Sequence, residues 1–238
     1  MPNKDYTYIA VIMDRSGSMS HLRQSTIDGF NEFLRGQQQL PGRADLMVIQ
    51  FDHEYLRTHS GSIHSMPPLN WCTYEPRGAT ALYDAIGRAV NELGTTLAGM
   101  LERNRPGKVV VVIMTDGMEN ASTVFNAQQI GEMIKHQTEV YSWNFMFLGA
   151  NQDAILSARA LNISGQNSVT YGSNSLNLGA TYTTLGHKMM AYRSTGLTSS
   201  LAFDEEDRRA LIDPNEALKK LTNTGGTTTT TTTKTDKS

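Results

Sequence analysis

Residues 8–20 read YIAVIMDRSGSMS, and this stretch decides the fold class. Its first half is a continuous apolar, β-branched run, which is typical of a strand buried on both faces of a parallel sheet. The run ends abruptly at Asp14, and Ser16 and Ser18 follow at alternate positions. A carboxylate at the end of a buried strand, followed by hydroxyls that share one side of an extended turn, indicates a binding site at the edge of a sheet.

The rest of the chain alternates apolar runs with helix-like segments, which is the pattern of a parallel sheet flanked by helices. We expect an edge strand or hairpin over 54–66 and five further strands, over 6–13, 44–51, 108–114, 140–149 and 167–172. We expect helices over 22–39, 81–103, 128–136, 153–161 and 174–193. The pattern therefore predicts an α/β domain.

The helical and strand pattern weakens after about residue 195. We expect one domain over 1–195, and a C-terminal extension over 196–223 that forms a short helix interrupted by Pro214. The Thr-rich segment 224–238 offers no apolar residue to bury, and we expect it to be disordered.

Bulk composition narrows the function classes. The chain has 238 residues, a formal net charge of -2 and one cysteine, Cys72. The near-neutral balance argues against a polyanion partner held by bulk electrostatics. A single cysteine forms no intrachain disulfide, and no apolar leader or membrane-length apolar run is present. We therefore expect a cytoplasmic protein that does not contact a membrane.

A second strand ends in the same way as the first. The apolar run KVVVVIM at 108–114 leads into Asp116 within a Thr-Asp-Gly triplet. If the two strands are neighbours, their ends lie roughly 5 Å apart. Two carboxylates at that separation repel each other unless a proton or a cation lies between them.

Hydroxyl groups complete a predicted cation site. Thr80 lies just before the helix expected from residue 81, where its side chain is free to face the same crevice. The predicted ligands are all hard oxygen donors, namely Asp14, Ser16, Ser18, Thr80 and Asp116. Such donors suit Mg²⁺, our first choice, and Mn²⁺; Ca²⁺ is less favoured and Zn²⁺ is disfavoured. The small negative charge of the set leaves the cation able to attract an anion from outside.

The three parts of this pattern resemble a known site. Asp-x-Ser-x-Ser at 14–18, Thr80 within Gly-Ala-Thr-Ala-Leu, and the later Thr-Asp-Gly resemble the metal-ion-dependent adhesion site of von Willebrand factor A domains. The resemblance covers about residues 6–193, and Asp-Arg-Ser-Gly-Ser-Met looks more like the bacterial and phage intracellular members. It implies a Rossmann-like three-layer αβα sandwich, with a mostly parallel sheet and one antiparallel edge strand. It also implies a bound Mg²⁺ and recognition of a partner through an acidic side chain that completes the coordination.

Other residues are candidates for a partner-binding rim around the site. Four of them also have a plainer interpretation: an exposed polar residue for His21, burial within a loop for Trp71 and Tyr74, and helix capping for Asn151. The rim candidates are Arg15, His21, Trp71, Tyr74, Arg77, Glu119, Asn120 and Asn151. The histidines at 53, 59 and 64 do not have the spacing of a zinc motif, and an alternating polar strand accounts for them.

Three functions remain open at this point. The first is a non-catalytic, metal-dependent module that binds a protein with an exposed Asp or Glu. The second is an Mg²⁺-dependent hydrolase or phosphotransferase, although the chain has no phosphate-binding loop motif. The third is a component of a ribonucleoprotein, against which the near-neutral charge argues. The partner, the oligomeric state and the biological process are not indicated by the sequence.

Overall fold

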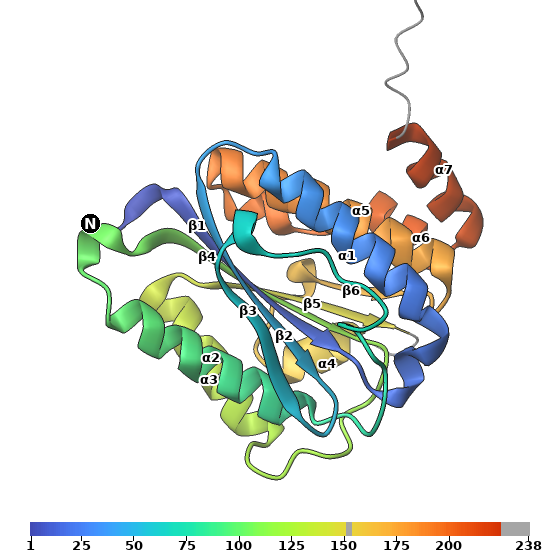
Figure 1. Cartoon of the computed structure of the whole chain (residues 1–238), viewed down its shortest axis with the longest axis horizontal. Coiled ribbons are helices and arrows are strands. Elements are labelled where there is room, and N and C mark those ends of the chain that lie inside the picture. The colour runs from blue at the N-terminus through green and yellow to red at the C-terminus, as the bar shows by residue number, and fades with distance from the viewer. Residues whose placement is uncertain (151–153, 225–238) are drawn as a thin grey trace, which may run out of the picture.

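The structure, a computed structural model, describes residues 1–150 and 154–224. The predictions for Asn151 and for the Thr-rich segment beyond Thr224 lie outside these residues. The described chain forms one six-stranded sheet with helices on both faces, as Figure 1 shows. The strands are β1 Asn3–Asp14, β2 Arg43–Phe51, β3 Tyr55–Ser62, β4 Pro106–Thr115, β5 Asn144–Ala150 and β6 Ser168–Tyr171.

The order of the strands across the sheet is β3-β2-β1-β4-β5-β6. Every adjacent pair is parallel except β2 and β3, which are antiparallel. The expected α/β class, with one antiparallel edge strand, is therefore confirmed. The chain leaves β1 toward β2 on one side, and later builds β4, β5 and β6 on the other side. The order reverses between β1 and β4, and in sheets of this kind ligands bind outside the carboxyl ends of the strands at such a point.

Two hydrophobic cores lie on the two faces of the sheet. Alternate residues of β1 enter different cores, with Ile9 and Val11 on one face and Ala10 and Ile12 on the other. This accounts for the unbroken apolar run in the sequence. The face that contains Ile9 is covered by α1 Arg23–Gln38 and α5 Ser175–Thr195; the opposite face is covered by α2 Leu82–Ala98, α3 Ala127–Tyr141 and α4 Ala154–Ala160 (Figure 1). The result is a three-layer αβα sandwich.

Helix and strand boundaries depart most from the sequence prediction at the end of α2 and at the junction of α3 and β5. The helix expected to run to residue 103 ends at Ala98, because the chain turns at Gly99 and a 3₁₀ turn follows. The strand expected from residue 140 starts only at Asn144. Residues 140 and 141 are the last turn of α3, which ends where Ser142 adopts a left-handed conformation with φ 56°. Short 3₁₀ turns are η1 Gly17–Leu22, η2 Ile63–Ser65, η3 Glu102–Asn104, η4 Gly165–Asn167 and η5 Thr198–Leu201.

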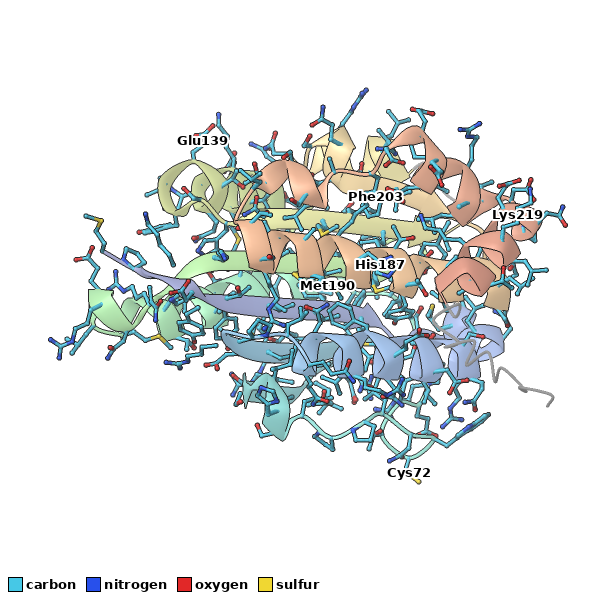
Figure 2. The ribbon with its side chains drawn as sticks, turned by 90° about the horizontal axis from the view of Figure 1, so that it is seen from above. Cys72, Glu139, His187, Met190, Phe203 and Lys219 are labelled. Carbon is cyan, nitrogen blue, oxygen red and sulfur yellow. The ribbon has the colours of Figure 1, made fainter. Side chains whose placement is uncertain are left out.

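The C-terminal extension forms two helices, α6 Glu205–Ile212 and α7 Pro214–Thr224. The expected interruption of the helix at Pro214 is present, and it separates two helices instead of kinking one. Proline is well tolerated in the first turn of a helix, where its missing N–H has no partner to lose, so Pro214 begins α7. Buried side chains of the extension join the core beside α5. They are Leu201, Phe203 (labelled in Figure 2), Leu211 and Ala217.

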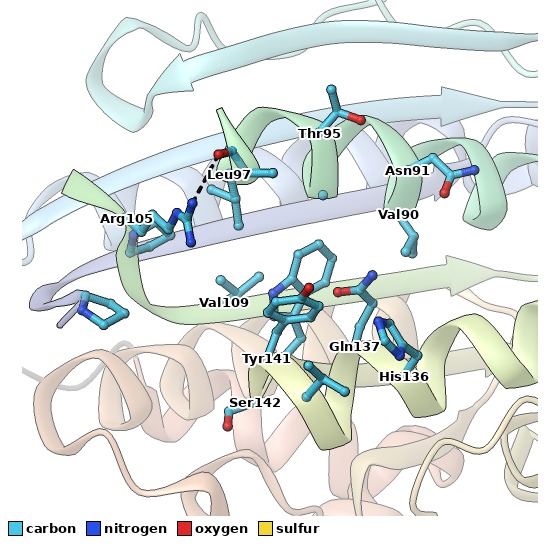
Figure 3. A pocket seen from close by; sticks show the side chains of 16 residues that line it. Val90, Asn91, Thr95, Leu97, Arg105, Val109, His136, Gln137, Tyr141 and Ser142 are labelled. Atoms are coloured by element: carbon cyan, nitrogen blue, oxygen red, sulfur yellow. Dashed lines mark hydrogen bonds between the residues drawn. The ribbon is translucent and has the colours of Figure 1, made fainter. Parts of the chain in front are cut away.

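A groove of about 680 Å³ lies between α2 and α3, shown in Figure 3. Its walls include Val90, His136 and Tyr141, and Arg105 lies at one end, where it donates to carbonyls at the end of α2. The start of β4 lines it, so the groove lies at the amino edge of the sheet, away from Asp14. Among the described residues, no helix is long and apolar enough to span a membrane.

Candidate metal centre

Asp14 is the last residue of β1 and is 1% exposed. Its carboxylate is held by two short hydrogen bonds. The backbone N–H of Ser16 donates to Oδ1 at 2.6 Å, and the hydroxyl of Thr115 donates to Oδ2 at 2.6 Å. Thr115 closes β4, the strand next to β1, so the sheet itself fixes the direction of this carboxylate.

The two serines connect Asp14 to the second strand end. The hydroxyl oxygens of Ser16 and Ser18 lie 3.0 Å apart, and the Ser18 hydroxyl donates to Oδ1 of Asp116 at 2.5 Å. Ser16 is buried, whereas Ser18 is exposed and Asp116 is half-buried. A continuous set of oxygens therefore runs from the end of β1 to the residue after β4, and it opens to solvent on the Ser18 side.

Gly117 shows where these oxygens converge. A Cβ placed on Gly117 would lie 3.1 Å from Oγ1 of Thr80, 3.4 Å from Oγ of Ser18 and 3.8 Å from Oδ2 of Asp14. The space over Gly117 is thus bordered by oxygens from two separate loops, the one that follows β1 and the one that contains Thr80, and any larger residue would fill it. The structure brings together all five residues that the sequence predicts as ligands.

The electrostatics of this cluster favour a cation. Burial raises the pKa of Asp14 to about 6, although hydrogen bonds from Thr115 and Ser16 oppose the shift. Burial also raises the pKa of Asp116, against the effect of the Ser18 hydrogen bond and of nearby His21. Both carboxylates are therefore poorly compensated when ionised, and a divalent cation between them would remove this cost.

The donor set fits a hard cation. It contains carboxylate and hydroxyl oxygens only, which are the ligands of Mg²⁺, Mn²⁺ and Ca²⁺. Within residues 1–150 and 154–224, no three His, Cys, Asp or Glu side chains form a group able to hold a metal. The histidines at 53, 59 and 64 therefore form no such group.

Thr80 is positioned by the segment that follows β4. The side-chain oxygen of Asn120 accepts from the backbone N–H of Thr80 at 2.9 Å, and the N–H of Asn120 donates to the Thr80 carbonyl at 3.0 Å. Glu119 accepts from the N–H of Tyr83 at 3.0 Å, in the first turn of α2. Glu119 and Asn120 are predicted from the sequence to lie on the rim. In the structure their side chains hold the Thr80 loop against the Thr-Asp-Gly segment.

The prediction that Tyr74 and Arg15 lie on the rim is wrong. Tyr74 is fully buried, and its hydroxyl donates to the backbone carbonyl of Asp14 at 2.7 Å. Tyr74 therefore packs inside the protein against the end of β1 and is not available to a partner. Arg15 is 6% exposed, because its side chain turns away from the crevice toward Asp52. In an extended turn, the residue between two inward-facing side chains points to the opposite side.

The remaining described rim candidates have different settings. His21 lies beside the site, with Nδ1 2.8 Å from the Ser18 carbonyl and Nε2 3.1 Å from the Ser173 hydroxyl. Trp71 is 55% exposed, and its indole N–H donates to Gln24. Arg77 is half-exposed and pairs with Asp52 and Glu54.

Two residues that shape the site, Thr115 and Gly117, are not among the residues predicted from the sequence. Thr115 orients Asp14, and Gly117 leaves the space open. Both flank Asp116 in the Thr-Asp-Gly triplet, and that triplet was the available signal. Only the pairing of β4 with β1 shows that the Thr115 hydroxyl faces Asp14.

Known proteins match this chain in structure but not in sequence. No protein-family model matches the sequence, and no curated protein shows significant similarity to it. Solved structures do match. Proximal thread matrix protein 1 from the mussel byssus, with a zinc-occupied MIDAS motif, superposes with a TM-score of 0.55 at 15% identity over 79% of this chain and 48% of that one.

Two further structures match to a similar extent. The pilus adhesin SpaC from Lactobacillus rhamnosus GG, in its open conformation, gives a TM-score of 0.57 at 14% identity, covering 79% of this chain and 30% of that one. The ArnB paralog VWA2 from Sulfolobus acidocaldarius gives 0.51 at 15% identity, covering 77% and 45%. The chain thus spans less than half the length of these proteins. By its strand order, its layers and these superpositions, the chain has the fold of the von Willebrand factor A domains.

Proposed function

We propose that this chain is a non-catalytic protein-binding module that holds one divalent cation and captures an acidic side chain of a partner through it. The observation that supports this proposal is the convergence of oxygens from Asp14, Ser18 and Thr80 on the space over Gly117. That space lies at the carboxyl edge of the sheet, at the point where the strand order reverses.

The cation would be held by Ser16, Ser18 and Thr80, together with the carboxylates of Asp14 and Asp116. Once bound, it supplies a positive charge that an incoming carboxylate can ligate. The exposed side of Ser18 and the half-buried Asp116 lie on the open side of the cluster, which leaves a route for a partner's Asp or Glu. Asp14, Ser16 and Thr80 are buried, and they close the protein side.

Mg²⁺ is the proposed ion, and Mn²⁺ would replace it well. Both are small ions that accept few, short oxygen contacts, whereas Ca²⁺ takes more ligands at longer distances. The five side chains offer a compact set of single oxygens. The zinc found in the MIDAS motif of the mussel protein shows that a site on this fold holds a divalent ion in that protein.

The test is selection from a random peptide display library on the immobilised chain. Peptides would be bound in Mg²⁺ and eluted with EDTA, using wild type and Gly117→Ala in parallel. We expect the wild-type eluate to be enriched in peptides with Asp or Glu, and the variant to retain none of them. Enrichment without acidic residues, or equal enrichment on the variant, would contradict the proposal.

The competing enzymatic function is tested separately. Hydrolysis of p-nitrophenyl phosphate would be measured with Mg²⁺ for wild type and Asp14→Ala. We expect no turnover above background in either protein. Turnover that the wild type shows and Asp14→Ala lacks would replace the binding proposal with a phosphatase.

A further inference from the structure

Asp52 is a fully buried carboxylate that lies outside the metal centre. It follows the last residue of β2, next to the end of β1, and is 0% exposed. Both of its oxygens are engaged. Oδ1 accepts from the backbone N–H of Glu54 at 2.6 Å, and Oδ2 lies between two arginines. A buried charge of this kind is tolerated only where it is paired.

The two arginines come from two different ligand-bearing loops. Nε of Arg15 lies 3.3 Å from Oδ2 of Asp52, and Arg15 stands between the predicted ligands Asp14 and Ser16. Nε of Arg77 donates to the same oxygen at 3.2 Å, and Arg77 lies three residues before Thr80. One carboxylate oxygen therefore links the serine loop to the threonine loop.

Backbone hydrogen bonds bring the same loops together. The N–H of Arg77 donates to the Arg15 carbonyl at 2.7 Å, and the N–H of Gly17 donates to the Gly78 carbonyl at 3.0 Å. The N–H of Ala81, the residue after Thr80, donates to the carbonyl of Asp52 itself at 2.8 Å. Asp52 thus contacts the threonine loop with its backbone and its side chain, and the serine loop with its side chain.

The charges of this group balance locally. Arg15 is buried, and the carboxylates of Asp52 and Glu54 face it and Arg77. Glu54 is exposed, so solvent screens its share of the attraction. Removing the negative charge of Asp52 would leave the Arg15 guanidinium buried with only this screened partner. The least costly response is an outward movement of Arg15, which would displace Ser16 and Ser18.

We infer that Asp52 is a positioning residue for the metal centre. Its carboxylate fixes the separation between the hydroxyls of Ser16 and Ser18 and the hydroxyl of Thr80, and so adjusts the cavity to a small ion. The inference rests on the proposed cation site. It assigns to the Arg15–Asp52–Arg77 group a role in metal affinity and ion size, beyond a contribution to stability.

The experiment is calorimetric titration of Mn²⁺ into the full chain at low temperature. Asp52→Asn keeps the shape of the side chain and removes its charge. Asp207→Asn is the matched control, because Asp207 is also a buried aspartate between two cationic side chains, but it lies in the C-terminal extension. Titrations of Mg²⁺ and Ca²⁺ against bound Mn²⁺ give the preference for ion size.

We expect Asp52→Asn to lower Mn²⁺ affinity about tenfold or more. The preference for Mg²⁺ over Ca²⁺ should fall as well, because looser loops accommodate longer bonds. Asp207→Asn should bind Mn²⁺ like wild type, even if its melting temperature falls as much as that of Asp52→Asn. If Asp52→Asn does not fold, Arg77→Gln replaces it, because Arg77 is half-exposed and its loss leaves the Asp52–Arg15 pair in place. Arg77→Gln should also lower both the Mn²⁺ affinity and the preference for Mg²⁺ over Ca²⁺.

If wild type binds Mn²⁺ and the variants bind it with the same affinity and the same ion preference, this inference is overturned and the proposed function is unaffected. A lower affinity with an unchanged Mg²⁺ to Ca²⁺ preference would also overturn it, since a purely structural loss does not discriminate by ion size. Absence of Mn²⁺ binding by the wild type would overturn the cation site, and this inference with it.

Discussion

At the scale of single residues, Gly117 gives the most specific prediction. Gly117→Ala places a methyl group within 3.1 Å of Oγ1 of Thr80, in the space where the oxygens converge. We expect Mn²⁺ affinity to fall by about a hundredfold or more, while the melting temperature in EDTA stays close to that of wild type. Calorimetry and thermal unfolding measure the two quantities.

Gly94→Ala is the matched control for this substitution. Gly94 lies inside α2, and a Cβ there would meet no atom within 4 Å. Alanine is favoured over glycine inside a helix by roughly 0.5–1 kcal/mol, so this variant should unfold at a higher temperature and bind Mn²⁺ normally. Equal loss of Mn²⁺ binding in both variants would show that the Gly117 effect is not local.

Asp14 gives a prediction in which stability and affinity change in opposite directions. Burial raises the pKa of this carboxyl to about 6 in the metal-free protein, so at pH 7 the folded state carries a charge that it disfavours. Asp14→Asn should therefore leave the metal-free chain at least as stable as wild type at pH 7. It should also weaken Mn²⁺ binding about tenfold or more, or ~1.4 kcal/mol. Lower metal-free stability together with normal affinity would contradict the assignment.

Residue types and spacing were sufficient to identify the five converging side chains. The carboxyl ends of β1 and β4 are readable from the sequence, because an apolar run stops at each, and neighbouring parallel strands bring these ends together. The sequence could not show which loop residues face inward. Tyr74 and Arg15 are both next to the site, yet one supports the backbone of Asp14 and the other pairs with Asp52. Such directions depend on contacts between loops that are far apart in the chain.

At the scale of elements, the C-terminal extension is part of the core. Leu211 of α6 is fully buried beside α5, whereas Leu218 of α7 is half-exposed. Leu211→Ala should lower the free energy of unfolding by about 2–5 kcal/mol, and Leu218→Ala by less than about 0.5 kcal/mol. Urea denaturation measures both. Equal small effects would show that α6 is not docked in solution.

An ion-paired group that connects α5, α6 and α7 makes the stability of the protein depend on pH in the acid range. Lys188 of α5 and Lys220 of α7 each lie 2.6 Å from Asp207 of α6. Burial alone would raise the pKa of Asp207, but the hydrogen bonds from the two lysines outweigh burial and lower it below 3.8. A lowered pKa in the folded state contributes stability that is present above the unfolded pKa and is lost as pH falls through the folded one.

Asp207→Asn should therefore remove part of this acid dependence. Wild type should lose stability below about pH 4 more steeply than the variant, and the two curves should run parallel at neutral pH. Urea midpoints measured across the acid range give the comparison. Parallel curves throughout would mean that Asp207 does not titrate differently in the folded protein.

Helices and strands were easier to predict than their ends. The apolar residues at 140–143 suggested a strand, yet Val140 and Tyr141 are exposed at the end of α3. The left-handed turn at Ser142 separates them from β5, and a polar residue in that conformation leaves little trace in sequence. Pro214 is ambiguous in the same way, since proline both ends one helix and begins the next.

At the scale of the whole molecule, the sheet supplies the geometry and the loops supply the chemistry. The reversal of strand order puts Asp14 and the Thr-Asp-Gly segment at one edge, and both hydrophobic cores hold that edge fixed. The groove between α2 and α3 (Figure 3) is lined by the start of β4, at the other end of the sheet, so it is separate from the cation site.

The most direct test of this account is anomalous diffraction from a crystal of the full chain grown with Mn²⁺. We expect a strong Mn²⁺ peak over Gly117, within bonding distance of Ser18 and Thr80 and adjacent to Asp14 and Asp116. The same crystal of Gly117→Ala should lack that peak. A crystal with no Mn²⁺ at this edge of the sheet, or with the peak retained in Gly117→Ala, would contradict it.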